Sequence, residues 1–216
     1  MSYKTDPISQ TFSFHEIIAN SATHAIGIGL SISGLAILIV QAARLGDPWY
    51  LGSVIVYGIS LILLYLASTV YHSTPKLRGN ALLQRLDHAA IFVLIAGTYT
   101  PFLLTKLRGP MGWITFGLVW GLALVTMVAK LVLTNTFVKP PVWLYVVMGW
   151  FAFLVFPQAM RDIGTTSLIS LLIGGIFYTS GILFYKWRKL PFSHAVWHLF
   201  VIGGSACHFL SVIQLV

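Results

Sequence analysis

The sequence has few charged residues, a single cysteine and no long polar stretch between its apolar runs. Charged side chains make up 8% of its 216 residues and hydrophobic ones 57%, whereas soluble globular domains carry about 25% charged residues. A water-soluble particle of this size would need far more polar surface than this chain can provide. The shortage of charge therefore excludes a soluble domain and indicates an integral membrane protein.

Other classes are excluded by the cysteine, by the placement of the basic residues and by the N-terminal sequence. Cys207 stands inside an apolar run, so a disulfide framework and a cysteine metal site are not expected. The 13 basic residues outnumber the 5 acidic ones, but no basic segment with interleaved aromatics resembles a nucleic-acid surface. A cleavable signal peptide is not expected, because Glu16 stands where its apolar part would begin. The expected partners are membrane lipids, including a lipid substrate; nucleic acid is not one.

Seven apolar runs follow one another along the chain, each close to the thickness of a bilayer. A helix needs about 20 apolar residues to cross a hydrocarbon core of about 30 Å. The spans are expected at 17–43, 51–72, 82–105, 112–133, 142–160, 165–186 and 193–215. Apolar residues run continuously instead of alternating, which argues against a membrane β-barrel. We therefore expect an all-α fold in which residues 1–216 form one seven-helix transmembrane domain, with a short polar segment at 1–15.

The basic residues are distributed unequally between the two ends of the predicted bundle. One end, with the N-terminus, holds Lys4, Lys76, Arg78, Arg85, Lys130, Lys139, Lys186, Arg188 and Lys189. The other end holds Arg44, Lys106, Arg108 and Arg161. Because cytoplasmic loops are enriched in Lys and Arg, we expect the N-terminus in the cytoplasm and the C-terminus outside, in a multi-pass protein of the cell membrane. The sequence does not determine an oligomeric state.

Ionisable residues inside membrane spans are costly and mark functional positions. Here they converge from four spans on the predicted cytoplasmic end of the bundle. They are Glu16 and His24 near the start of the first span, His72 at the end of the second, Asp87 near the start of the third, and His194 and His198 near the start of the seventh. This convergence predicts a polar site in that layer.

The histidines have the spacing of metal ligands. His194 and His198 are four residues apart, which stacks both imidazoles on one helix face. With His72 from another span they make a three-histidine set with an open fourth position, as in catalytic zinc sites. We expect Asp87 either to hold or deprotonate the metal-bound water or to orient a ligand, with Ser68, one turn before His72, sharing this task. Without a metal, the same histidines would be hydrogen-bonded interior residues.

Further residues have supporting or structural interpretations. Glu16, Asn20 and His24 share one face of the first span, where they support the site or join helices by hydrogen bonds. His88 lies about 100° around the helix from Asp87 and is interpreted as structural. His208 lies about 15 Å beyond His198, too far to bind the same metal. Ser193 is the expected N-cap of the seventh span. Gly27, Gly29 and Gly34 are expected at close helix contacts.

Four motifs, taken together and in this order, resemble the bacterial hemolysin III family, which belongs with the progestin and adiponectin receptors. They are Glu16-x-x-x-Asn20-x-x-x-His24, Ser68-Thr69-Val70-Tyr71-His72-Ser73, Leu86-Asp87-His88-Ala89-Ala90-Ile91 and His194-Ala195-Val196-Trp197-His198. The resemblance covers essentially the whole chain and implies a seven-helix bundle with a cytoplasmic N-terminus. It also implies zinc on His72, His194 and His198, with Asp87 contacting the zinc-bound water and Ser68 nearby.

Three functions follow as alternatives. The first is a zinc-dependent hydrolase of a lipid amide or ester, for which the resemblance also suggests a ceramide-like amide. The second is a membrane sensor or receptor in which zinc is a structural clamp between spans. The third is a cytolysin or channel, as the family name implies, although few interior charges lie away from the histidine layer to form an ion pathway. An open metal position beside a lipid-sized cavity would favour the hydrolase.

Overall fold

The computed structural model describes residues 13–74, 81–132, 142–155, 162–187 and 189–215, which form seven helices. Their bounds are α1 Phe14–Leu45, α2 Pro48–Ser73, α3 Ala81–Leu104, α4 Pro110–Val132, α5 Val142–Val155, α6 Thr165–Lys186 and α7 Ser193–Ile213. The all-helical bundle and the order of the helices are confirmed. Residues 75–80 and 134–141, which lie between predicted spans, are outside the described residues. Because α1 begins at Phe14, the last two residues of the predicted polar segment belong to this helix.

Six of the seven helices are long and apolar enough to cross a membrane, so the chain is a multi-pass membrane protein. The exception is α5, whose 14 residues span about 21 Å, less than the hydrocarbon core of about 30 Å. Residues 156–160, which the sequence predicts as the end of this span, lie outside the described residues. The exterior of the bundle is apolar, with many exposed Leu, Ile, Val and Trp side chains, as expected of a surface that faces lipid.

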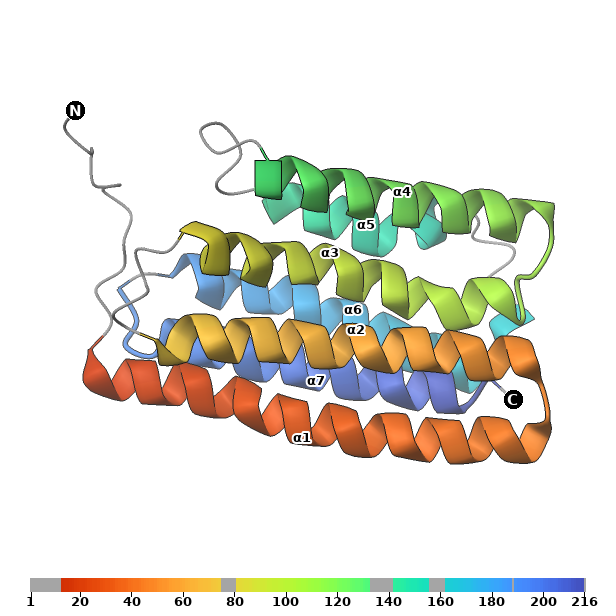
Figure 1. Cartoon of the computed structure of the whole chain (residues 1–216), viewed down its shortest axis with the longest axis horizontal. Coiled ribbons are helices and arrows are strands. Elements are labelled where there is room, and N and C mark those ends of the chain that lie inside the picture. Colours follow the sequence, from red (N-terminus) through yellow and green to blue (C-terminus); the bar gives the residue numbers. More distant parts are fainter. Residues whose placement is uncertain (1–12, 75–80, 133–141, 156–161, 188, 216) are drawn as a thin grey trace.

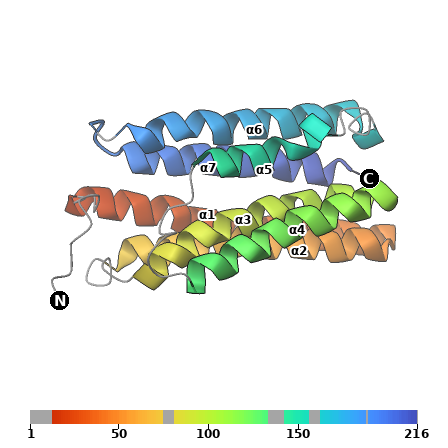
Figure 2. The same ribbon diagram turned by 90° about the horizontal axis from the view of Figure 1, so that it is seen from above.

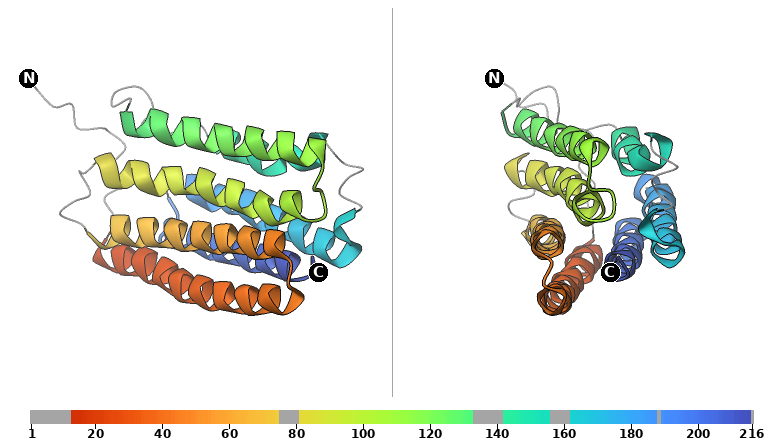
Figure 3. Two further views of the ribbon diagram at one scale, coloured as in Figure 1. Left: turned by 45° about the vertical axis from the view of Figure 1, so that its right-hand side comes forward. Right: turned by 90° about the vertical axis from the view of Figure 1, so that its right-hand side faces the viewer.

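The helices stand side by side in two rows. Figure 2 shows α1 to α4 in one row and α5 to α7 in the other, and the end-on view of Figure 3 shows the rows facing each other. Successive helices run in opposite directions, so the start of α1 and the end of α7 lie at opposite ends of the bundle (Figure 1). The start of α1, the end of α2, the start of α3 and the start of α7 therefore meet at one end, called here the N-terminal end of the bundle.

The close packing of α1 on α2 depends on Gly27. A Cβ atom at this position would lie 2.5 Å from Cδ1 of Tyr65, whose ring rests on the α1 backbone. Gly29 has nothing within 4 Å of the place where its Cβ would be, and it is exposed. The prediction of a close helix contact is thus confirmed at Gly27 and wrong at Gly29, because a shift of two residues turns the glycine to the outer face of the helix.

We expect Gly27→Ala to lower the stability of the protein, because the added methyl group would displace the Tyr65 ring. Overpacking of this kind costs about 1–3 kcal/mol. The measurement is the thermal unfolding midpoint in detergent, with Gly29→Ala as the matched control. Gly29→Ala should leave the midpoint unchanged or raise it slightly, since alanine favours helix more than glycine does. Equal midpoints for the two variants would contradict this account of the contact.

Candidate metal centre

The three predicted histidine ligands come together at the N-terminal end of the bundle. His72, His194 and His198 each offer a ring nitrogen, and these nitrogens all lie within 4.8 Å of one another. Nε2 of His72 lies 3.1 Å from Nε2 of His194. His72 and His198 are buried and His194 is half-buried. Together these residues are called the histidine cluster.

The donor set and its spacing suit a small transition-metal ion. Two nitrogens bound tetrahedrally to one zinc at about 2.0–2.1 Å lie about 3.3–3.4 Å apart, close to the separation of the His72 and His194 nitrogens. The cluster contains only imidazoles, ligands suited to zinc, copper, iron or nickel. The three histidines therefore fit a metal ion after small side-chain movements, and the geometry does not select one metal.

His198 is oriented by the backbone of α1. Its Nδ1 lies 3.0 Å from the main-chain oxygen of Asn20. Because a carbonyl oxygen only accepts hydrogen bonds, the proton sits on Nδ1, and Nε2 keeps its lone pair for a metal. Thr23 reinforces this arrangement, with its hydroxyl 3.1 Å from the same Nδ1. Asn20 thus supports the site through its carbonyl group, which the sequence pattern does not reveal.

His24 packs directly on the cluster without joining it. Its ring is stacked on His198, with the centroids 3.5 Å apart and the planes at 18°. Tyr65 packs against His24 in an edge-to-face arrangement, with the ring centroids 5.0 Å apart. His24 therefore supports His198 by ring packing, as Asn20 does by a hydrogen bond.

Glu16 joins the starts of α1 and α7. One carboxylate oxygen accepts from the Ser13 backbone N–H (2.8 Å), and the Ser13 hydroxyl accepts from the Glu16 N–H, forming a capping box. The other oxygen accepts from the backbone N–H of Phe192 at 3.1 Å. Phe192 has φ 57°, a left-handed conformation that is uncommon for a bulky residue. Glu16 thus holds the turn that delivers His194.

The prediction that Ser193 is the N-cap of α7 is wrong. Ser193 is the first residue of the helix and is buried, while Phe192 occupies the N-cap position without a side-chain hydrogen bond to the helix. A serine before an apolar run is typical of a cap, but the left-handed turn at Phe192 moves the boundary by one residue. The hydrogen bond from Phe192 to Glu16 comes from a distant part of the chain, so local sequence cannot reveal it.

We expect Glu16→Ala to destabilise this corner by about 1–2 kcal/mol, because both the capping box and the Phe192 contact are lost. Glu16→Gln should cost much less, since glutamine also completes a capping box. The measurement is the unfolding midpoint of each variant in detergent. An alanine variant as stable as the glutamine variant would show that the carboxylate does not hold this turn.

Asp87 and Ser68 lie together beside the cluster. The Ser68 hydroxyl donates a side-chain hydrogen bond to the Asp87 carboxylate, and both residues line one cavity with His24, His194 and His198. The carboxylate also faces the charge of the buried Lys130 ammonium on α4. Among the described residues, that ammonium has no hydrogen-bond partner. Asp87 is thus held by neighbours on α2 and α4, at the polar end of the cavity.

The cavity extends from the cluster through the bundle between the two rows of helices. Its volume is about 200 Å³, smaller than the roughly 300–1,000 Å³ of pockets for drug-sized ligands. Along α3 its lining runs from Asp87 to Leu103, a rise of about 24 Å. A long, narrow and mainly apolar space of this kind suits a single extended chain better than a bulky ring system.

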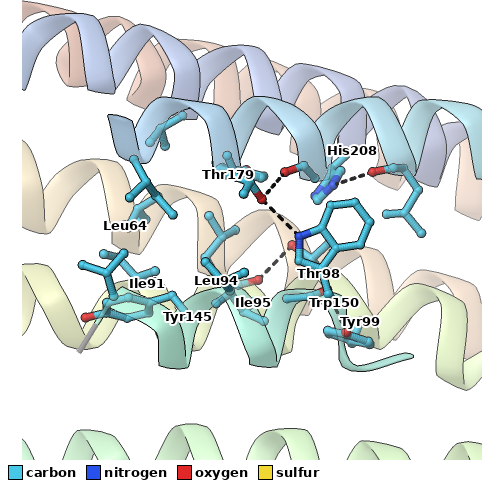
Figure 4. Close-up of a pocket in the computed structure, with 18 of the residues that line it drawn as sticks. Leu64, Ile91, Leu94, Ile95, Thr98, Tyr99, Tyr145, Trp150, Thr179 and His208 are labelled. Atoms are coloured by element: carbon cyan, nitrogen blue, oxygen red, sulfur yellow. Dashed lines mark hydrogen bonds between the residues drawn. The ribbon is translucent and has the colours of Figure 1, made fainter. Parts of the chain in front are cut away.

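Beyond the cluster, the polar groups that line the cavity mostly bond to the protein itself. Figure 4 shows Leu64, Ile91, Leu94 and Ile95 along the apolar part of the wall. Further along, Trp150 donates its indole N–H to the Thr179 hydroxyl at 3.1 Å, and Nε2 of His208 lies 3.2 Å from the oxygen of Leu171 (Figure 4).

Two further histidines line the cavity. His208 is outside the histidine cluster, as its distance along α7 predicts. His88 lines the same cavity as Asp87, although the helical period turns it about 100° away around α3.

Comparison with known proteins gives consistent matches along nearly the whole chain. Residues 12–209 match the family model described as Haemolysin-III related. The chain is 43% identical to the Hemolysin-3 homolog of Bacillus subtilis (strain 168), covering 94% of this chain and 95% of that protein. It is 44% identical to Hemolysin-3 of Bacillus cereus, covering 92% and 90%. It is 30% identical to the human Monocyte to macrophage differentiation factor, covering 92% and 83%.

Proposed function

The chain belongs to the haemolysin-III family, and from this premise we propose that it is a zinc-dependent hydrolase that cleaves an amide or ester bond of a membrane lipid. The observation that carries the proposal is the histidine cluster at the polar end of an apolar cavity, beside the Ser68–Asp87 pair. We further propose that all seven helices cross the cell membrane with the N-terminus in the cytoplasm, following the distribution of basic residues.

His72, His194 and His198 would hold the zinc ion. Zinc with three imidazole ligands and an open fourth position supplies a Lewis acid that activates water near neutral pH and polarises a carbonyl group. The chain orients its ligands for this purpose: the Asn20 carbonyl fixes the proton of His198 on Nδ1 and leaves Nε2 available. His24 stacks on the His198 ring, and Tyr65 packs against His24 in turn, so that His24 is held in place and restricts the rotation of His198.

Asp87 would act as the general base and then as the general acid. Its carboxylate, held by the Ser68 hydroxyl, would accept a proton from the attacking water and return it to the leaving group, at the nitrogen of an amide or the oxygen of an ester. Hydrolysis then consumes one water and releases a fatty acid and the amine or alcohol. The buried Lys130 ammonium stabilises the ionised carboxylate before the reaction, because opposite charges attract strongly away from bulk water.

The apolar cavity would hold the lipid chain. Its lining places Leu64, Ile91 and Leu94 along the path away from the cluster. A chain bound there is removed from water, and its carbonyl end faces the histidines and Asp87. The orientation of the substrate thus follows from the separation of polar and apolar lining within one cavity.

The test is hydrolysis of fluorogenic long-chain amide and ester lipids by detergent-purified protein. The proposal expects turnover by the zinc-loaded protein, loss of turnover after chelation, and recovery when zinc is returned. A protein that binds one zinc, is stabilised by it and cleaves neither lipid would instead use the metal as a clamp between α2 and α7. Liposome leakage that persists after replacement of His72, His194 and His198 would indicate a cytolysin.

A further inference from the structure

His24 is a buried imidazole with unused hydrogen-bonding capacity beside the histidine cluster. Its residue is 3% exposed and it lines the cavity. Among the described residues, neither of its ring nitrogens has a hydrogen-bond partner. A buried polar group without a partner is unfavourable, and such groups in native proteins require an explanation.

Polar side chains around His24 already form hydrogen bonds with other groups. The Tyr65 hydroxyl, whose ring contacts His24, donates to the Ser205 hydroxyl at 2.7 Å. The Thr23 hydroxyl donates to main-chain oxygens of the preceding turn, at 2.8 Å from that of Ala19. His198 uses Nδ1 for the Asn20 carbonyl. None of these groups is placed to satisfy the His24 ring.

The stacking geometry separates the role of His24 from that of a metal ligand. The two ring planes are nearly parallel, at 18° and 3.5 Å, so the in-plane nitrogens of His24 do not point at the His198 ring. His24 is also outside the group of nitrogens that could share one metal ion. A neutral imidazole offers one N–H donor and one acceptor nitrogen. These groups lie next to the polar end of the cavity, one ring thickness from a ligand of the metal.

We propose that His24 is a specificity residue that hydrogen-bonds a polar group of the cavity's ligand next to its carbonyl. This inference rests on the proposed function in one respect, that the cavity binds a carbonyl-bearing lipid chain. It predicts that a lipid with a hydroxyl or amide N–H beside the carbonyl binds more tightly than the same chain without this group. The preference arises because only the lipid with this polar group can form a hydrogen bond with the buried His24 imidazole.

The experiment compares two probes that cannot be hydrolysed. One is a long-chain methyl ketone, and the other is the same ketone with a hydroxyl group on the methyl carbon next to the carbonyl. Binding of each to the zinc-loaded, detergent-solubilised protein is measured by isothermal titration, and zinc content is measured in parallel. The variants are His24→Phe, which keeps a stacking ring without nitrogens, and His24→Gln and His24→Leu. His15→Phe is the matched control, since His15 is an exposed histidine on the same helix.

The wild-type protein and His15→Phe should bind the hydroxyketone about tenfold more tightly than the ketone, the effect of one hydrogen bond. His24→Phe should abolish this ratio while retaining zinc and ketone affinity. If His24→Phe does not fold, His24→Gln is compared with His24→Leu. A higher ratio of hydroxyketone to ketone affinity in the glutamine variant supports the proposal, and equal ratios in the two variants overturn it. Equal binding of both probes by the wild-type protein, or an unchanged ratio in His24→Phe, also overturns it.

The outcome is separable from that of the proposed function. Discrimination between the ketones without hydrolysis of any lipid would leave the role of His24 standing and remove the hydrolase. Hydrolysis of lipids without discrimination between the ketones would support the hydrolase and overturn the role of His24.

Discussion

Replacing His198 with alanine is expected to abolish zinc binding and to remove the thermal stabilisation that zinc gives to the wild-type protein. His198 is 1% exposed and is held by the Asn20 carbonyl, and its loss leaves only two of the three imidazoles whose nitrogens lie within 4.8 Å of one another. A ligand that binds only the folded state stabilises it by about 4 kcal/mol at a thousandfold excess over its Kd. The measurement is zinc content together with the shift of the unfolding midpoint on adding zinc.

His208→Ala is the control for this prediction. His208 is also a buried histidine of α7, but it contacts the Leu171 oxygen and is outside the histidine cluster. The His208→Ala protein should be somewhat less stable, because a core side chain is lost. It should still bind zinc, and zinc should still raise its unfolding midpoint. A His198→Ala protein that keeps full zinc content, or a His208→Ala protein that loses it, would show that the metal binds elsewhere.

Replacing Asp87 with asparagine is expected to lower lipid hydrolysis by about 10²–10⁴-fold, because a positioned general base contributes an effect of this size. Asparagine keeps the shape and the hydrogen bond to Ser68 but does not accept a proton from water. Zinc content should remain at the wild-type level, since Asp87 is not in the histidine cluster. The measurement is kcat with the fluorogenic lipid that the wild-type protein cleaves.

Ser68→Ala is the companion variant for this second prediction. It should reduce kcat less than Asp87→Asn does, because Ser68 acts by holding the carboxylate. Loss of zinc from Asp87→Asn would show that the carboxylate supports the metal instead of the proton transfer. Wild-type kcat in Asp87→Asn would remove Asp87 from the mechanism.

The order of the helices and the meeting of the three histidines could be predicted because they depend on patterns along the chain. Continuous apolar runs of bilayer length fix the number of helices, and the spacing of His194 and His198 fixes their common face. His72 could be added because alternating helix directions bring the end of α2 and the start of α7 to one end of the bundle. The structure brings these three residues together.

Contacts that depend on helix rotation or on the main chain could not be predicted. The stacking of His24 on His198 requires the exact facing of α1 and α7, which residue spacing within α1 does not determine. The Asn20 group that bonds to His198 is its main-chain carbonyl, which every residue type has, so no side-chain pattern indicates this bond. Gly29 looks like Gly27 in sequence, and only the packed bundle shows that one faces Tyr65 and the other faces outward.

The most direct test of the central claim is X-ray absorption at the zinc edge of the purified, zinc-supplied protein. The account predicts about one zinc per chain with four light-atom ligands at about 2.0–2.1 Å, of which imidazole scattering accounts for three. That result would establish a three-histidine site with one position open to water or substrate. Absence of zinc, a sulfur ligand at about 2.3 Å, or a fourth imidazole that closes the site would contradict it.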